Sequence, residues 1–412
     1  MSRRPALFFV LLCVFLDALC IGLIIPVLPR LLGVLTVSRE EQAFWYGAVM
    51  VGYGLTQFPC PPILGALSDR FGRRPLLLSG ILGLGVMSLV PALTTSPAAI
   101  LISRILGGAL SANVVVAQAY IADITPVSER AQSFGRIGAV FGLAYILGPA
   151  LGGVLGDLSE RLPFFTAFAV CAGNFLYGLL LVPESLPIER RKTAVHAASP
   201  LPALKRLLSH AGVPNLLGIL FLVLLSQSMV QVTWSLYAEF RYAWSPMEIG
   251  LSIFALGAAI TITQALLLPG LLRHFSPTLV VRLGVLIGLA SLLCVALTKN
   301  PLCGTAFLCL SAVVGVAGPV LQASVSKIAK ADDQGATMGG LNSLNSFARG
   351  ISPLFGTPLL LYTAGHDPAS LAAGLPYFLA AALLLLALAL SLHLALAILT
   401  SRDDVPIEPP NL

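Results

Sequence analysis

The sequence predicts an all-α integral membrane protein with twelve transmembrane helices in two six-helix bundles. Composition predicts the class, because 57% of the 412 residues are hydrophobic, 10% are charged and the mean hydropathy is +0.92. The apolar runs predict helices, because many reach the length of about 20 residues that a helix needs to cross a bilayer. No segment shows the alternation over about ten residues that is typical of a transmembrane β-barrel.

Twelve candidate spans follow one another along the chain. They cover residues 7–29, 43–64, 76–95, 98–121, 132–156, 163–182, 214–236, 247–269, 279–297, 302–325, 336–361 and 372–399. A polar, basic and proline-containing stretch separates the first six from the last six. We therefore expect an N-terminal bundle at 1–182, a linker at 183–213, a C-terminal bundle at 214–399 and a tail at 400–412. Two near-equal halves indicate an internal repeat.

Lysine and arginine predict the orientation, because they stay on the cytoplasmic side in short loops. With the N-terminus inside, eighteen of the 24 basic residues, Arg349 among them, are assigned to cytoplasmic segments. Arg104 falls within a span, and five residues fall outside: Arg30, Arg39, Arg161, Arg241 and Lys299. We expect a multi-pass protein of a bacterial inner membrane with both termini cytoplasmic. The net charge of +6 follows from this topology and predicts no nucleic-acid partner.

The first span carries Asp17 in its middle and lacks a small-residue cleavage site, so we interpret it as a retained helix rather than a signal peptide. An ionisable group at that depth needs a partner or a path for water. Because burial disfavours the charged form of a carboxylate, Asp17 is a candidate for binding and releasing a proton. A structural hydrogen bond to a neighbouring helix is the alternative.

A charged segment, "GALSDRFGRRP", joins the second and third spans. Gly65 and Gly72 permit close backbone approach and a tight turn. Asp69 is placed to lie against a helix N-terminus and to pair with an arginine such as Arg73 or Arg130. The plainer interpretation is that these arginines and Arg70 anchor the topology.

Two further features lie inside spans. Arg104 needs acceptors for a buried guanidinium, either for proton transfer or as a structural link to backbone carbonyls. The fifth span contains "GLAYILGPALGGVLG", whose glycines allow close helix contact and whose proline bends the span. Simple packing explains these residues almost as well as a seal against proton leak. They are Gly142, Gly148, Pro149, Gly152 and Gly153, followed by Gly156.

Uncharged polar side chains within spans are candidates for a substrate site, because an amide in hydrocarbon must find a partner. The residues selected are Asn113, Gln118, Gln231 and Trp234, from a wider set that includes Gln227, Gln264, Gln322, Asn342 and Asn345.

Other functional classes lack their usual sequence signals. The five histidines are scattered without metal-ligand spacing, and the seven cysteines show no paired spacing. There is no phosphate-binding GxxxxGK[ST] loop and no filter-like repeat. We therefore expect neither an enzyme nor a channel, and no metal or cofactor.

These motifs together resemble the major facilitator superfamily. "GALSDRFGRRP" is similar to its loop between helices two and three, "ISRILGGALSA" to its fourth-helix motif with a buried arginine, and the span-five segment to its antiporter motif. "LDALCIGLIIPVLPRLL", "IADITPVSERAQSFGRIGAVFGL" and "LYAEFRYAW" resemble the twelve-span drug:proton antiporters, in particular the tetracycline efflux pumps.

The resemblance implies alternating access with a substrate site between the bundles, proton coupling through Asp17 and Arg104, and a cytoplasmic latch at Asp69 and its neighbours. It also implies a histidine and a membrane-embedded aspartate in spans eight and nine, where this chain has Ile260 and Gly288, and Met87 stands where a third-span acid is expected.

We thus expect a proton-coupled, monomeric exporter of an amphipathic, tetracycline-like drug, with protons and the lipid bilayer as its other partners. A multidrug or other-antibiotic antiporter of the same fold is the alternative, and a nutrient symporter is a third.

Overall fold

The computed structural model describes residues 3–57, 59–110, 113–126, 129–191, 208, 213–328 and 334–403. Within these residues the chain is helical and contains no strand. The first half contains α1 (Arg3–Ile24), α2 (Leu28–Leu35), α3 (Arg39–Gln57), α4 (Cys60–Phe71), α5 (Arg73–Leu93), α6 (Pro97–Leu110), α7 (Asn113–Ile124), α8 (Arg130–Leu158) and α9 (Leu162–Leu181). After the short helix η2 (Ile188–Arg190), the second half contains α11 (Val213–Tyr242), α12 (Pro246–Ile262), η3 (Thr263–Leu267), α13 (Leu268–His274), α14 (Pro277–Leu297), α15 (Pro301–Ser311), η4 (Ala312–Val316), α16 (Ala317–Ile328), α17 (Gln334–Ala364), η6 (Ala372–Gly374) and α18 (Leu375–Asp403).

Ten helical segments of the described chain are long and apolar enough to cross a membrane. The other two expected spans, 43–64 and 336–361, correspond to the α3–α4 pair and to α17. The first is interrupted between Gln57 and Cys60, and α17 carries Asn342, Asn345 and Arg349 along its length. A helix that faces a polar cavity is less apolar than one surrounded by lipid, which explains why these two differ from the rest. The count of twelve stays a prediction.

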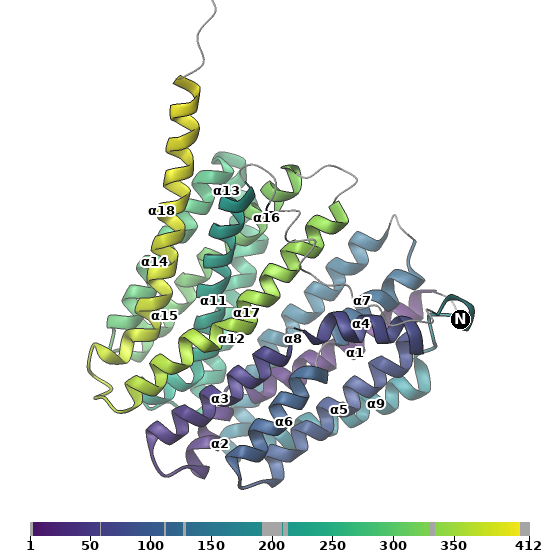
Figure 1. Ribbon diagram of the computed structural model, residues 1–412. Coiled ribbons are helices and arrows are strands. Elements are labelled where there is room, and N and C mark those ends of the chain that lie inside the picture. The colour runs from purple at the N-terminus through teal and green to yellow at the C-terminus, as the bar shows by residue number, and fades with distance from the viewer. Residues whose placement is uncertain are drawn as a thin grey trace, which may run out of the picture.

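The helices form two groups (Figure 1). In the first, α8 and α9 pack on α1, α9 packs on α5, and α3 on α6; in the second, α11 and α14 pack on α18. Contacts between the groups run mainly through α8 with α12 and α3 with α17. The groups meet at the lower end of the view in Figure 1 and diverge toward its upper right.

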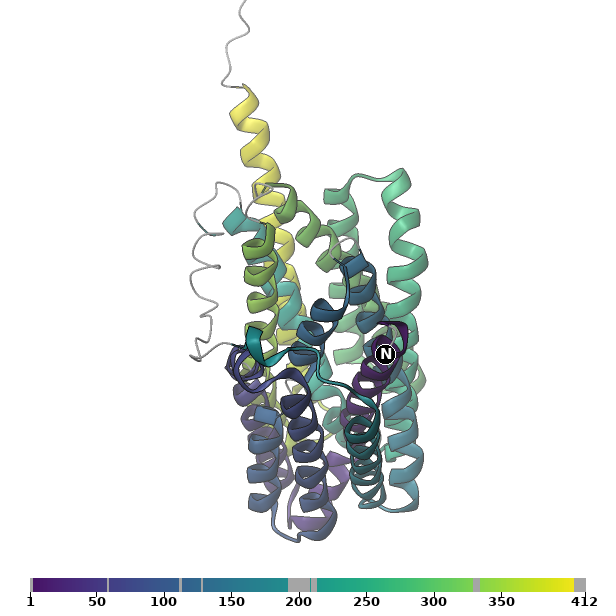
Figure 2. The same cartoon turned by 90° about the vertical axis from the view of Figure 1, so that its right-hand side faces the viewer.

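The expected domain boundaries lie close to helix ends, since α9 ends at Leu181 and α11 begins at Val213. Most of the predicted linker, residues 192–207 and 209–212, lies outside the described residues, as do residues 404–412 of the predicted tail. Helix α18 projects well past the other helices in both views (Figure 2). The division into two bundles with a linker stays a prediction.

Two faces of the molecule are distinguished by their turns. We call the face that carries the start of α1, the α4–α5 turn at Gly72 and the segment 183–191 the terminal face. The opposite face carries the turns at Thr94–Ser96, Ser159–Arg161 and Ala243–Ser245. A capping box formed by Ser245 and Glu248 begins α12 there, because each side chain accepts from the other's backbone N–H.

Helix contacts are tight toward the opposite face and open toward the terminal face. Gly148 of α8 packs directly on Gly22 of α1, and Gly153 of α8 on Gly250 of α12. In contrast, a Cβ atom added at Gly135 or Gly138, nearer the start of α8, would meet nothing within 4 Å. The two groups are therefore closed against each other at one face and separated at the other.

Candidate functional site

A central cavity of about 510 Å³ lies between the two helix groups. This volume falls in the range of about 300–1,000 Å³ that is typical of small-molecule sites. The first group contributes lining residues from α1, α3, α4, α7 and α8, and the second from α17. The polar side chains in its lining are Asp17, Gln57, Gln118, Asn345, Ser346 and Arg349.

Asp17 lines this cavity although the residue is buried, with a relative exposure of 3%. The amide Nδ2 of Asn113, at the start of α7, donates to Asp17 Oδ1 over 3.2 Å. Gly80 of α5 makes room for Asn113, because a Cβ atom there would collide with its amide. Asn113, expected to bind substrate, is buried and contacts Asp17 instead of lining the cavity. Its position fits a role in orienting the carboxylate.

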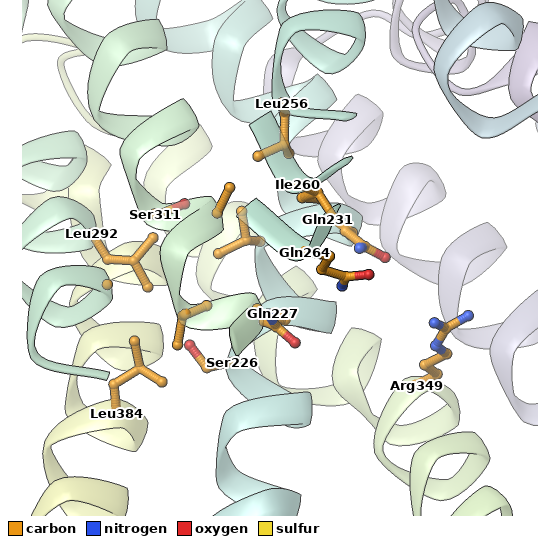
Figure 3. Close-up of a pocket in the computed structure, with 15 residues that line it drawn as sticks. Ser226, Gln227, Gln231, Leu256, Ile260, Gln264, Leu292, Ser311, Arg349 and Leu384 are labelled. Carbon is orange, nitrogen blue, oxygen red and sulfur yellow. The ribbon is translucent and has the colours of Figure 1, made fainter. Parts of the chain in front are cut away.

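A second cavity, of about 200 Å³, lies within the second group (Figure 3). Its polar lining includes Gln227 and Gln231 of α11 and Gln264 of η3. The Nε2 atoms of Gln227 and Gln264 each lie 3.8 Å from the position a Cβ atom would take at Gly315 of η4, so the two amides converge. Gln264 belongs to a π-helical turn, an element that is found frequently at functional sites. Ile260 and Gly288 line the same cavity.

Arg349 lines both cavities. It was expected among the basic residues of the cytoplasmic segments, and that expectation is wrong: the residue lies at the middle of α17, within a predicted span. A charged side chain is tolerated at that depth where it faces a polar cavity. The sequence signal for this location was that Arg349 falls inside the predicted span 336–361.

Arg104 lies buried in α6 and lines neither cavity. Its guanidinium carbon stands 5.8 Å from the centre of the Phe164 ring, a cation–π geometry. Its Nε and Nη2 atoms are buried without a hydrogen-bond partner among the described residues. The expected role in proton transfer stays a prediction.

The charged turn on the terminal face forms a compact ion-pair network. Arg73, 8% exposed, lies 2.6 Å from Asp69 and donates from Nε to Asp123 of α7 over 3.1 Å. It also donates to the Ser68 hydroxyl over 2.6 Å. The predicted pairing of Asp69 with Arg73 is thus present, and Asp123 is a partner that the sequence motif did not indicate. The side chain of Arg130 lies outside the described residues.

The N-terminus of α5 is capped by Glu184, which follows α9. Its Oε1 accepts from the backbone N–H of Arg73 over 2.9 Å, and its Oε2 from that of Arg74 over 3.3 Å. Gly72 has a φ of 103°, and Glu184 occupies the space that a Cβ atom would need. Arg70 is exposed and lies 5.2 Å from the Phe71 ring centre. Gly65 packs α4 against Val115 of α7.

The glycines of the predicted antiporter segment divide between two neighbours. Gly148 and Gly152 face the α1 backbone at Gly22 and Leu23, whereas Gly153 faces the start of α12. The carbonyl of Pro149 lies against Gly250 of α12. Helix α8 therefore packs on α1 of its own group and on α12 of the other, whereas Gly142 is exposed and has no neighbour within 4 Å of a Cβ position.

Two of the four predicted substrate residues line cavities. Gln118 lines the central cavity and Gln231 the second. Trp234 is 1% exposed, donates from Nε1 to the Ser252 hydroxyl over 2.8 Å and packs among Tyr237, Trp244 and Tyr377. Its indole is enclosed away from both cavities.

Polar contacts join the two groups on the opposite face. Gln42 of α3 donates to Glu239 of α11 over 3.1 Å, and the Tyr46 hydroxyl donates to the Val232 carbonyl over 2.7 Å. At the seam between α8 and α12, Asp157 accepts from the backbone of Met247 and from Ser245. These contacts hold the groups together at the end where the cavities are closed.

Two helical groups around polar cavities, closed at one face and open at the other, define a membrane transporter rather than an enzyme. The chain belongs to the Major Facilitator Superfamily, whose family model matches residues 10–353.

Relatives and solved structures agree with this assignment. The chain is 34% identical over 385 residues to the Tetracycline resistance protein, class C, of Escherichia coli, covering 93% of this chain and 96% of the relative. It is 28% identical to Multidrug resistance protein 2 of Bacillus subtilis, covering 70% of this chain and 72% of the relative. The structure of the human organic anion transporter MFSD10 (TETRAN) matches with a TM-score of 0.65 and 25% identity, covering 95% of this chain and all of that one.

Proposed function

We propose that this protein exports an amphipathic drug in exchange for protons, by alternating exposure of the central cavity to the two sides of the membrane. The observation that carries the proposal is Asp17, a carboxylate that is buried in the first helix and lines a drug-sized cavity between the helix groups. A carboxylate at such a position binds a proton when desolvated and releases it when water reaches it.

The terminal face is the cytoplasmic face in this proposal. Arg70, Arg73 and Arg74 lie on it, and basic residues concentrate on the cytoplasmic side of membrane proteins. The structure then corresponds to a state open to the cytoplasm, from which a drug enters the cavity. The bacterial relatives favour an inner-membrane location. The proposed working unit is a monomer.

Opening and closing are assigned to the two sets of contacts already described. The Asp69–Arg73–Asp123 network stiffens the terminal face of the first group, and the α8 glycines with Asp157 close the opposite face. The close backbone packing of α8 against α1 and α12 leaves little space for water, which supports a seal against proton leak.

Tetracycline is the first substrate to test, because of the E. coli relative. The second cavity favours a change of substrate, since Ile260 and Gly288 line it at the two positions where the chain departs from the pattern of the tetracycline pumps. A multidrug antiporter is therefore the second candidate, which the B. subtilis relative supports. The human relative adds organic anions to the compounds to be tried.

Proton movement in inside-out membrane vesicles tests the proposal. Vesicles that carry the protein are acidified inside, and a pH-sensitive dye follows the gradient as tetracycline and then a panel of other drugs are added. We expect an active drug to dissipate the gradient with the wild-type protein and not with Asp17→Asn. Glu189→Gln, which removes an exposed carboxylate from the terminal face, serves as the control.

Each other result has a defined meaning. Equal responses from the wild type and Asp17→Asn would assign proton coupling to a different group. A response to another drug but not to tetracycline would keep antiport and replace the substrate. Symport would be indicated if the gradient is dissipated only by drug loaded inside the vesicles, because drug and protons would then leave together.

A further inference from the structure

Arg349 is a positive charge placed at the junction of the two cavities. It lies halfway along α17, and its side chain is exposed to the cavities that it helps to line. In Figure 3 Arg349 reaches in from α17, and the amide ends of Gln231 and Gln264 point toward the side on which it lies. Because guanidinium stays protonated at any physiological pH, this charge is permanent.

Several other arginines have hydrogen-bond or ion-pair partners within the protein. Arg73 pairs with two carboxylates, Arg282 bonds to Ser391, and Arg241 bonds to backbone carbonyls. For the Arg349 guanidinium, the described residues supply neither a hydrogen bond nor an ion pair. Asp17 is the carboxylate in the lining of the central cavity, and Asn113 donates to it within the first group.

The polar groups around Arg349 are mostly neutral, and Tyr145 of α8 is close enough to interact with it electrostatically. Gln227, Gln231 and Gln264 lie across the second cavity, and Asn345 lies one helical turn before Arg349 in the central cavity. The Oδ1 atom of Asn345 is buried without a hydrogen-bond partner among the described residues. An amide adds donors and acceptors without adding charge, so the charge in the lining of the second cavity comes from the guanidinium of Arg349.

We propose that Arg349 and the facing amides of Gln231 and Gln264 bind an anionic oxygen group of the transported compound. A carboxylate, sulfonate or enolate oxygen matches the fork of guanidinium donors, and the amides satisfy its remaining lone pairs. Leu256, Ile260 and Leu292 supply the apolar wall for the body of the compound. The inference rests on the proposed transport function and narrows its substrate class to anionic or zwitterionic amphiphiles.

Binding to the purified, full-length protein in detergent tests this inference without requiring proton coupling. The probes are fluorescein, an anionic xanthene dye, and rhodamine 6G, a cationic dye with a similar ring system. We expect Arg349→Gln to weaken fluorescein binding by about tenfold or more, the usual effect of losing a charge-assisted bond, and to leave rhodamine 6G binding equal or stronger. Arg349→Lys should recover part of the loss, because it keeps the charge without the fork.

Arg273→Gln is the matched control, since it removes an exposed arginine of α13 that lines neither cavity. Unchanged fluorescein affinity in Arg349→Gln would overturn the inference. A parallel loss of both dyes would also overturn it, because it would indicate collapse of the cavity rather than loss of an anion partner.

The wild-type protein provides a second measurement that needs no variant. We expect 1-naphthoate, a carboxylate, to displace bound fluorescein and its uncharged amide, 1-naphthamide, to fail. Equal displacement by the two compounds would contradict the inference. Dye binding that depends on Arg349, combined with no proton movement in vesicles, would leave the anion site standing and remove the proposed coupling, so the two failures are distinguishable.

Discussion

Asp157, at the end of α8, accepts hydrogen bonds from the backbone N–H of Met247 over 3.2 Å and from the hydroxyl of Ser245 over 3.3 Å, both at the start of α12. A carboxylate at a helix N-terminus is favoured by the partial positive charge there. Because α8 and α12 belong to different helix groups, this contact fastens the two groups together at the closed face.

Asp157→Ala should shift the protein toward the state in which the opposite face opens. Losing two accepted hydrogen bonds and one favourable end charge costs the closed face about 1–2 kcal/mol. Spin labels placed at residues 70 and 273, on the terminal ends of the two groups, would report the shift as a growing population of shorter distances.

Glu160→Ala is the control for this experiment. Glu160 lies on the same face but pairs with Arg30, over 3.5 Å, inside the first group. A distance distribution that changes equally in both variants would show that the Asp157 contact does not fasten the seam.

Gly148→Ala should lower both stability and transport. The added methyl carbon would lie 2.7 Å from the Gly22 Cα, closer than van der Waals contact allows, and backbone cannot move aside as a side chain can. Overpacking of this kind costs about 1–3 kcal/mol. Thermal unfolding in detergent and drug-driven proton movement are the readouts.

Gly135→Ala separates packing from helix propensity, since it places the same methyl group on α8 where no atom lies within 4 Å. We expect equal or slightly higher stability there, because alanine favours the helix over glycine by about 1 kcal/mol. Similar losses at both positions would contradict close packing as the cause.

Glu184→Ala should destabilise the terminal face by about 1 kcal/mol, the usual cost of losing a helix N-terminal cap. Its carboxylate accepts from the first two backbone N–H groups of α5 and lies 3.6 Å from Arg191. Hydrogen exchange of the backbone amides of Arg73 and Arg74 should increase. Glu189→Ala, at an exposed position of the same segment, should leave exchange unchanged.

Arg73 and Asp123 should be energetically coupled. A double-mutant cycle with Arg73→Gln and Asp123→Asn should give an interaction free energy of about 1–3 kcal/mol, because the buried guanidinium of Arg73 is hydrogen-bonded to the Asp123 carboxylate. The cycle is measured by thermal unfolding. Strictly additive effects would mean that Arg73 is held by Asp69 and Ser68 alone.

Much of the architecture follows from the sequence because hydrophobic run length is a local property. The apolar runs predicted helical spans, and the structure places helices at these runs. The charged segment between the second and third spans also predicted that Asp69 pairs with an arginine such as Arg73 or Arg130, and the pair with Arg73 is present. The family followed from short motifs that stand in a fixed order along the chain.

The partners of these residues could not be predicted in the same way. Glu184 is separated from Arg73 by 111 positions and Asn113 from Asp17 by 96, and no periodicity links such pairs. Trp234 and Gln231 lie on adjacent turns of one helix, yet one is enclosed among aromatic rings and the other lines a cavity. A helix surrounded by other helices on all sides shows little amphipathic pattern, so its sequence does not reveal which side faces the cavity.

The sequence by itself determined that the chain is a helical membrane protein, because the free energy of inserting a segment into a bilayer depends on its local composition. Its short motifs indicated the transporter class. Tertiary structure alone decided which polar residues meet. It joined Asp17 to Asn113, brought Arg349 to the boundary of two cavities and closed α8 against α12 through glycine contacts. The physical reason is that helix packing depends on side-chain shape at long sequence separation, whereas insertion into a bilayer depends on the average polarity of about 20 consecutive residues.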